Sequence, residues 1–293
     1  MTIISYRDPD AIVTGQWLEA HIDDANLRIF DCTTHLVPES GSPEPYRVVS
    51  GRGGFQAGHI PGAGYLDLQK DFSVSDSPFG MTLADADHVA QAFARAGISD
   101  GTRVILYARG AMSWATRFWW MLRWLGFDNA AVLDGGFDKW LADNRPVSLN
   151  SPAYPPGTLT PAPRPSLFVG RREVYDAIGD PATSTICALG ADVFAGNSPR
   201  YGRPGRIPGS VNVPQVSLID PATCEFLPAA TVARMFSAAG ADPAKSIITY
   251  CGGGIFATLN AFLLHQLGYE NIAVYDNSMS EWGKDETLPI EVG

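Results

Sequence analysis

A six-residue turn pattern occurs twice in this 293-residue chain and constrains the fold more than any other feature. Residues 58–63 read G-H-I-P-G-A, and residues 205–210 read G-R-I-P-G-S. Shorter matches follow both copies in the same order: 125–127 with 267–269, 131–134 with 273–276, and Trp140 with Trp282. Repetition over this length predicts two structural units of one fold.

Strands and helices are predicted to alternate in each unit. Buried-strand patterns lie at 28–32, 103–107, 131–134 and 246–249, and helical patterns lie at 84–96 and 259–267. The segment 38–54 is rich in Pro, Ser and Gly and predicts a loop. The alternation predicts an α/β fold with two tandem domains, each a parallel sheet flanked by helices.

A proline-rich segment separates the two units. Residues 145–166 contain seven prolines, which is too many for a helix or a central strand. We therefore expect an extended linker over 146–166, between a first domain of residues 1–145 and a second domain of residues 167–293.

One cysteine stands at a predicted strand-to-helix junction in the second unit only. Cys251 is followed by Gly252, Gly253 and Gly254, whereas the first unit has Ala108 at this position and a loop one residue longer. Glycines let the backbone curl around the sulfur, and loop amides and the helix dipole favour a thiolate. We expect Cys251 to be a nucleophile with a lowered pKa, and the first domain to line a cleft beside it. A buried, inert cysteine beside a flexible turn is the alternative.

Charge and cysteine spacing exclude several classes of protein. The formal net charge is -10 with only 21 Lys and Arg, which argues against nucleic-acid and anionic-membrane partners. The start of the sequence lacks a basic and then apolar signal pattern, and no run of 18 apolar residues occurs, so a cytoplasmic protein is expected. The four cysteines lack metal-ligand spacing, so we expect free thiols, no metal and no cofactor.

These residues together resemble the tandem-domain rhodanese sulfurtransferases, across nearly the whole chain. The loop that begins at Cys251 is similar to the C-G-S-G-V-T loop of the branch that uses 3-mercaptopyruvate. The resemblance implies that Cys251 accepts a sulfane sulfur as a persulfide. It implies that the loop amides hold the outer sulfur and that Arg200, in 198–200, holds the donor carboxylate. The implied loop residues are Gly252, Gly253, Gly254, Ile255 and Phe256.

The sequence also departs from that family. Gly253 replaces the loop serine, Phe256 replaces its threonine, and 186–189 read I-C-A-L where an Asp-x-Arg is usual. The resemblance implies sulfur transfer from 3-mercaptopyruvate or a related mercapto-acid to cyanide or a thiol, such as thioredoxin or a small thiol. A thiosulfate donor and a non-enzymatic sulfur-carrier module are the alternatives. A cysteine-dependent phosphatase is disfavoured, because the arginine it needs six positions after the cysteine is Ala257 here.

Several further side chains are candidates for the site. They are Arg203, Arg206, Arg52, His59 and Asp276, each with a structural role as the alternative. His59 is expected to brace its own turn, and Asp276 to orient the loop amides or to serve the fold. Trp119, Trp120 and Trp124 predict core or interface packing, and Cys32 and Cys187 lie in buried-strand patterns.

Overall fold

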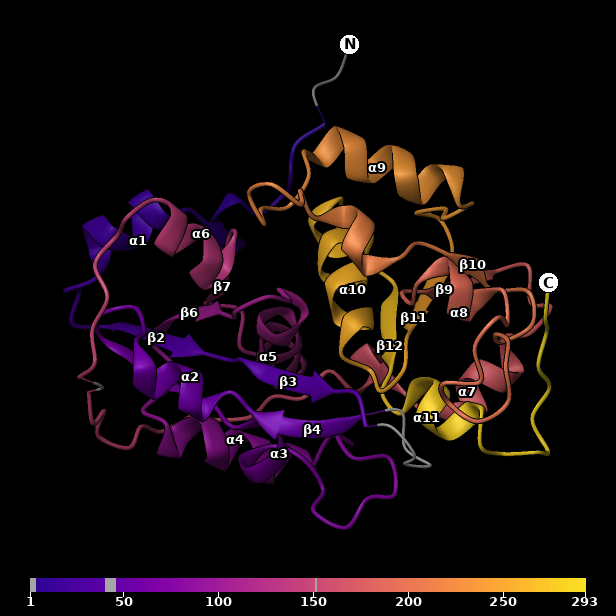
Figure 1. Ribbon diagram of the computed structural model, residues 1–293, viewed down its shortest axis with the longest axis horizontal. Coiled ribbons are helices and arrows are strands. Elements are labelled where there is room, and N and C mark those ends of the chain that lie inside the picture. The colour runs from indigo at the N-terminus through magenta and orange to yellow at the C-terminus, as the bar shows by residue number, and fades with distance from the viewer. Residues whose placement is uncertain (1–3, 40–45, 151) are drawn as a thin grey trace.

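The computed structural model describes residues 4–39, 46–150 and 152–293, and two five-stranded sheets form its framework (Figure 1). The first sheet has the order β1 (Ile12–Val13), β7 (Ala130–Leu133), β6 (Arg103–Tyr107), β2 (Leu27–Asp31), β5 (Ala63–Tyr65). The second has the order β8 (Phe168–Val169), β12 (Ile272–Tyr275), β11 (Ser246–Tyr250), β9 (Thr183–Cys187), β10 (Val211–Asn212). Every pairing within these sheets is parallel, and the order is the same in both. The predicted duplicated α/β fold is confirmed.

Helices flank both sheets. The first domain contains α1 (Gly15–His21), α2 (Arg52–Ala57), α3 (Leu68–Asp71), α4 (Ala86–Arg95), α5 (Ser113–Trp124) and α6 (Gly136–Ala142). The second contains α7 (Arg171–Asp176), α8 (Ala191–Phe194), α9 (Ala229–Ala238), α10 (Phe256–Gln266) and α11 (Ser278–Trp282). Short 3-10 helices lie at Pro9–Ala11, Pro165–Leu167 and Gln215–Leu218.

The first sheet is buried on both faces. Alternate residues of a strand point to opposite sides, so Val104 and Leu106 join the main core while Ile105 joins a second cluster. The main core continues into the second domain and includes Val274. Strands buried on both faces read as continuous apolar runs, which explains why 103–107 was recognisable as a strand.

One predicted loop is wrong. Residues 38–54 contain β4 (Arg47–Ser50), which pairs antiparallel with β3 (Thr34–Val37), and α2 begins at Arg52. Residues 47–50 form a strand because their backbone hydrogen-bonds to β3. The composition of 38–54 alone does not reveal that partner. Figure 1 shows β3 and β4 extending from the first domain toward α11 of the second. The part of the prediction at 40–45 lies outside the described residues.

The domains pack through α5 and α10. The Thr116 and Thr258 hydroxyls lie 3.0 Å apart, and the rings of Trp119 and Phe262 meet edge-on with centroids 4.8 Å apart. The Trp120 indole donates a 2.9 Å hydrogen bond to the carbonyl of Leu167. Trp124 packs edge-on against Phe168 at 5.9 Å. The predicted packing roles of the three tryptophans are confirmed, and residues 152–164 of the linker form no helix or strand.

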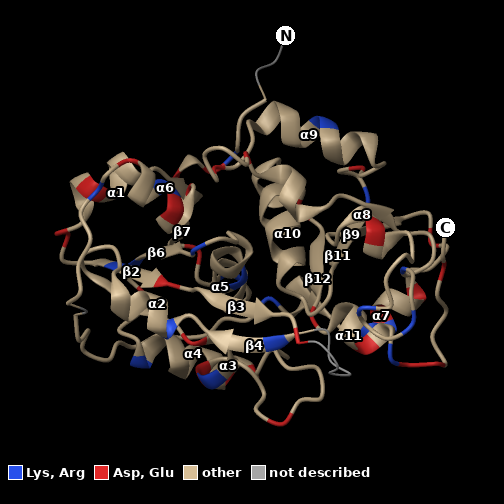
Figure 2. Cartoon of the chain, in the orientation of Figure 1, with Lys and Arg blue, Asp and Glu red and all other residues tan. Residues whose placement is uncertain are grey.

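A buried ion pair crosses this interface. Arg117 on α5 is fully buried, and its Nη2 lies 2.6 Å from Oδ1 of Asp276, just after β12. The same guanidinium donates to the carbonyls of Gly254 at 3.3 Å and Met81 at 3.4 Å. The other oxygen of Asp276 accepts the amide of Leu83 at 2.7 Å. Figure 2 shows α10, β11 and β12 without charged residues, so the cation of this pair comes from α5 of the first domain.

We predict that Arg117→Met lowers the free energy of unfolding by about 3–5 kcal/mol, because it leaves the Asp276 carboxylate, whose side chain is only 13% exposed, without its cation. Urea unfolding followed by circular dichroism measures the loss. Arg123→Met, on the same helix, is the matched control: Arg123 pairs with the half-exposed Asp128 at 2.9 Å, so we expect a loss under about 1 kcal/mol. Equal losses for the two variants would contradict the prediction.

Candidate active site

Cys251 follows the last residue of β11 at the carboxyl edge of the second sheet, and α10 begins five residues later. Its side chain is only 2% exposed. The Cys251 amide donates to the Ser278 hydroxyl at 3.0 Å, and the amide of Met279 donates to the Cys251 carbonyl at 3.1 Å. The amide of Ser280 donates to the carbonyl of Gly252 at 2.7 Å. The start of α11 therefore holds the cysteine loop from one side.

The next amides of the loop are unused. Within the described part of the chain, the amides of residues 252–256 donate to no protein acceptor. Such amides at a helix N-terminus are suited to bind an anion or a polarisable sulfur. That they bind sulfur here stays a prediction.

Two of the three loop glycines are required by close contacts. Gly254 has φ +73°, and a Cβ there would lie 2.1 Å from the carbonyl oxygen of Asp276. A Cβ on Gly252 would lie 2.2 Å from the Tyr201 hydroxyl. At Gly253, by contrast, the nearest atom is the Met81 Cε at 3.6 Å, an ordinary contact distance. The tight curl thus depends on positions 252 and 254, while position 253 has room for a side chain.

Cys251 lies in a narrow pocket built by both domains. The lining residues are Leu36, Tyr46 and Met81 from the first domain, and Tyr201, Cys251, Gly252, Gly253, Ile255 and Phe256 from the second. The cavity volume is about 10 Å³, enough for about one water molecule. A second pocket of about 250 Å³ adjoins it, sharing Tyr46 and Met81 and including Ser280 and Lys284. The prediction that the first domain lines the cysteine's cleft is confirmed.

Two tyrosines flank the cysteine, and sequence reasoning missed both. The Tyr46 ring meets the Tyr201 ring edge-on with centroids 6.4 Å apart, and the hydroxyls of Tyr46 and Ser280 both lie 3.8 Å from the Cβ position of Gly253. Burial, with a smaller contribution from the nearby Cys251, raises the pKa of Tyr46 to about 12. Burial also raises the pKa of Tyr201 well above its usual value, so both phenols stay protonated at neutral pH. No local pattern marks Tyr46, because it reaches the site through the β3–β4 excursion.

Arg200 lies outside this pocket, on its tyrosine wall. Its guanidinium carbon is 5.6 Å from the centre of the Tyr46 ring and 5.9 Å from that of Tyr201, while the side chain is exposed. Cation–π contacts of this kind keep the charge beside the pocket without consuming its hydrogen-bond donors.

Arg203 and Arg206 serve the C-terminal segment instead. Arg203 donates to the carbonyls of Leu288 at 2.9 Å and Trp282 at 3.0 Å. Arg206 pairs with the Glu291 carboxylate and exchanges backbone hydrogen bonds with the same residue. Neither arginine lines the cysteine pocket.

The two first-domain candidates, His59 and Arg52, lie away from the Cys251 pocket. His59 exchanges backbone hydrogen bonds with Ser148 and stacks on Phe55, so it braces its own turn as expected. Arg52 lies over the Tyr65 ring at 4.8 Å. Neither residue lines the Cys251 pocket.

Asp276 lies behind the cysteine loop. Its carbonyl packs against Gly254, and its carboxylate holds Arg117, which in turn binds the Gly254 carbonyl. Asp276 therefore supports the loop backbone rather than facing the pocket. Arg117 is the third residue that sequence reasoning missed, because nothing local distinguishes it from a helix-surface arginine.

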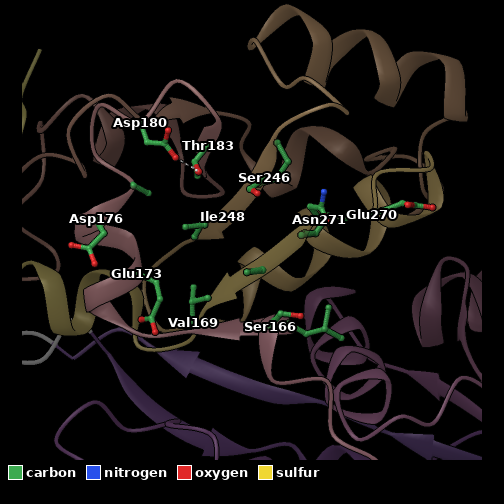
Figure 3. Close-up of a pocket in the computed structure, with 15 residues that line it drawn as sticks. Ser166, Val169, Glu173, Asp176, Asp180, Thr183, Ser246, Ile248, Glu270 and Asn271 are labelled. Atoms are coloured by element: carbon green, nitrogen blue, oxygen red, sulfur yellow. Dashed lines mark hydrogen bonds between the residues drawn. The ribbon is translucent and has the colours of Figure 1, made fainter.

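A larger pocket lies at the opposite end of the second sheet (Figure 3). It has a volume of about 490 Å³ and includes Ser246, the first residue of β11, whereas Cys251 follows the last. Its rim carries the carboxylates Glu173, Asp176, Asp180 and Glu270. Carboxylates repel an anionic sulfur donor, so this pocket is not a donor site.

Predictions from the sequence also cover the other cysteines, metal-binding clusters and membrane-spanning helices. Cys32 and Cys187 are buried as predicted, and burial raises the pKa of Cys187 to about 12. Among the described residues, no cluster of three or more His, Cys, Asp or Glu side chains is arranged to hold a metal ion. No helix in the described ranges is long and apolar enough to cross a membrane.

The fold and the site together define a class: a duplicated α/β protein in which one repeat carries a cysteine inside a glycine-rich strand-to-helix loop. Comparison with protein families matches the rhodanese-like domain to residues 14–143 and 192–285. The chain belongs to the tandem-domain rhodanese family of sulfurtransferases.

Several relatives match nearly the whole chain. The 3-mercaptopyruvate sulfurtransferase of Mus musculus is 32% identical, covering 93% of this chain and 91% of that protein. The Escherichia coli protein of the same name is 31% identical, with coverage of 95% and 97%. The sulfur carrier protein TtuD of Thermus thermophilus is 27% identical, with coverage of 99% of each chain.

Solved structures agree with this fold. The crystal structure of SseA, a 3-mercaptopyruvate sulfurtransferase from Escherichia coli, matches with a TM-score of 0.78 and 28% identity, over 92% of this chain and 98% of that one. An anaerobic ergothioneine biosynthesis enzyme from Chlorobium limicola matches with a TM-score of 0.81 over 98% of this chain and 71% of that one. At 19% identity, the second match supports the fold alone.

We predict that Gly254→Ala and Gly253→Ala differ sharply. Gly254→Ala combines a positive φ with a Cβ pressed against the Asp276 carbonyl, so the loop must distort and we expect loss of Cys251 reactivity. Gly253→Ala meets only ordinary contacts, so its reactivity should stay within about threefold of wild type. The rate of Cys251 alkylation by iodoacetamide, read by peptide mass spectrometry, measures both. Equal rates for the two variants would refute this account of the loop.

Proposed function

We propose that this protein transfers sulfane sulfur from 3-mercaptopyruvate, or a related mercapto-acid, to a thiol or cyanide through a persulfide on Cys251. The observation that carries this proposal is the placement of Cys251 in a pocket with unused loop amides and no cationic lining residue. A persulfide enzyme needs an activated thiol, hydrogen-bond donors for the outer sulfur and a site for the anionic end of the donor.

The first half-reaction loads the cysteine. The Cys251 thiolate attacks the mercapto sulfur, the carbon–sulfur bond breaks, and its electron pair forms the enolate of pyruvate. The mercapto proton ends on the enolate carbon, so pyruvate leaves and a persulfide anion remains on Cys251. The amides of residues 252–256 would hold the outer sulfur.

The second half-reaction transfers the outer sulfur from the Cys251 persulfide to an acceptor. An acceptor thiolate, such as that of thioredoxin or a small thiol, attacks the outer sulfur and breaks the sulfur–sulfur bond. The Cys251 thiolate is restored, and the acceptor carries the persulfide. Cyanide would accept the same sulfur and leave as thiocyanate. Nucleic acid and membrane have no part in this scheme, and free, buried thiols such as Cys187 fit a reducing cytoplasm.

The choice of donor follows from charge. Thiosulfate is a dianion, and no lining residue of the cysteine pocket carries a positive charge. A mercapto-acid places a single carboxylate away from the reacting sulfur, where the exposed Arg200 on the tyrosine wall would meet it. This arrangement favours 3-mercaptopyruvate over thiosulfate.

A sulfur-carrier role is the second candidate. The cysteine cavity holds about one water molecule, which fits the outer sulfur of a persulfide better than a whole donor. In that case another protein would load Cys251, and free mercaptopyruvate would load it only slowly.

We predict that wild-type protein incubated with 3-mercaptopyruvate gains the mass of one sulfur atom, and that Cys251→Ala does not. Intact-mass spectrometry makes the measurement, and dithiothreitol should remove the added mass because it attacks the outer sulfur. Equal addition to both proteins would reject Cys251 as the carrier. No addition to wild type would favour the sulfur-carrier role.

We predict that Arg200→Met raises KM for 3-mercaptopyruvate about tenfold and leaves kcat within about twofold, because a carboxylate contact made equally in ground and transition states affects binding alone. Steady-state pyruvate release measures both constants. Arg234→Met, an exposed arginine on α9, is the control and should leave KM unchanged. A fall in kcat at constant KM would place Arg200 in the chemical step instead.

A further inference from the structure

Hydroxyl groups are the neutral donors beside the reactive sulfur. The side chains that line the cysteine pocket are apolar apart from Cys251 itself and the phenols of Tyr46 and Tyr201. Burial raises the pKa of both phenols, and the nearby Cys251 adds to that rise. The two rings meet nearly at right angles, with centroids 6.4 Å apart.

The two phenols come from different domains. Tyr46 stands before β4 in the first domain, and its hydroxyl lies 3.8 Å from the Cβ position of Gly253. Tyr201 belongs to the second domain, and its hydroxyl packs against Gly252. Ser280, whose hydroxyl is also 3.8 Å from the Gly253 Cβ position, contacts Tyr46. The phenol oxygens are therefore fixed above the two residues that follow Cys251.

We propose that the hydroxyls of Tyr46 and Tyr201 bind the carbonyl oxygen of the sulfur donor and stabilise the enolate as the carbon–sulfur bond breaks. This inference rests on the proposed sulfur transfer and names its substrate class: mercaptans with a carbonyl next to the sulfur-bearing carbon. Negative charge moves to that oxygen only during loading, so the tyrosines act in the first half-reaction.

The phenols of Tyr46 and Tyr201 suit this role because they are strong hydrogen-bond donors placed inside the pocket. A buried, protonated phenol donates a strong hydrogen bond to a developing oxyanion in a pocket that excludes water. Arg200 lies 5.6 Å and 5.9 Å from the centres of the two rings and does not line the pocket, so the phenols, and not this guanidinium, are placed to donate to the oxygen. A sulfur donor without a carbonyl, such as thiosulfate, forms no enolate for these phenols to stabilise.

The experiment separates the two half-reactions. Tyr46→Phe and Tyr201→Phe keep each ring and remove only the hydroxyl. We expect either change to slow persulfide formation from 3-mercaptopyruvate about 10²-fold in a single turnover. Discharge of a preformed Cys251 persulfide to cyanide should stay within about twofold of wild type. Tyr175→Phe, an exposed tyrosine on α7, is the control and should change neither rate.

The possible results distinguish a failure of the tyrosine role from a failure of the proposed sulfur transfer itself. Slower loading with normal discharge supports it, because a merely structural role would impair both steps. Wild-type loading rates in both Phe variants, or equal slowing of loading and discharge, overturn it. If wild-type protein gains no sulfur from 3-mercaptopyruvate, the proposed donor itself is wrong, whatever the tyrosine variants do.

Discussion

The ion pair between Arg117 and Asp276 is the contact on which the site depends. It joins α5 of one domain to the residue after β12 of the other, and both partners also touch the loop at Gly254. Burying charge is costly unless the remaining hydrogen bonds are satisfied. Here the Met81 carbonyl accepts from Arg117 and the Leu83 amide donates to Asp276, while the Arg117 Nε has no partner among the described residues. Domain packing and loop shape are thus set by one set of contacts.

The loops that follow the two equivalent central strands differ between the repeats. Both repeats end a central strand at the same edge of an equivalent sheet, β6 in the first and β11 in the second. In the first repeat, Arg109 follows the strand, lies 3.4 Å from Asp31 and covers the Phe137 ring at 3.8 Å. That loop is filled by its own side chain. The first domain contributes Tyr46, Leu36 and Met81 to the lining of the cysteine pocket.

Much of the fold and the centre of the site could be predicted from the sequence. Continuous apolar runs such as 103–107 reveal buried parallel strands, and the paired turns reveal the duplication. The cysteine loop was recognisable because its residues are contiguous. Tyr46 and Arg117 were not, because their roles depend on contacts with residues more than 150 positions away. Arg203 and Arg206 carry the same charge as Arg200, and only tertiary contacts separate their roles.

The shared construction of the pocket has a consequence for how the chain could be divided. A catalytic half cut free within the linker would keep its thiol and its glycine loop, yet it would lose Tyr46, Met81 and the cation at Arg117 together. Its thiol would then open directly to water, and the Asp276 carboxylate would lose its counterion. This protein is therefore a single working unit, and neither fragment should be expected to retain the chemistry of the whole.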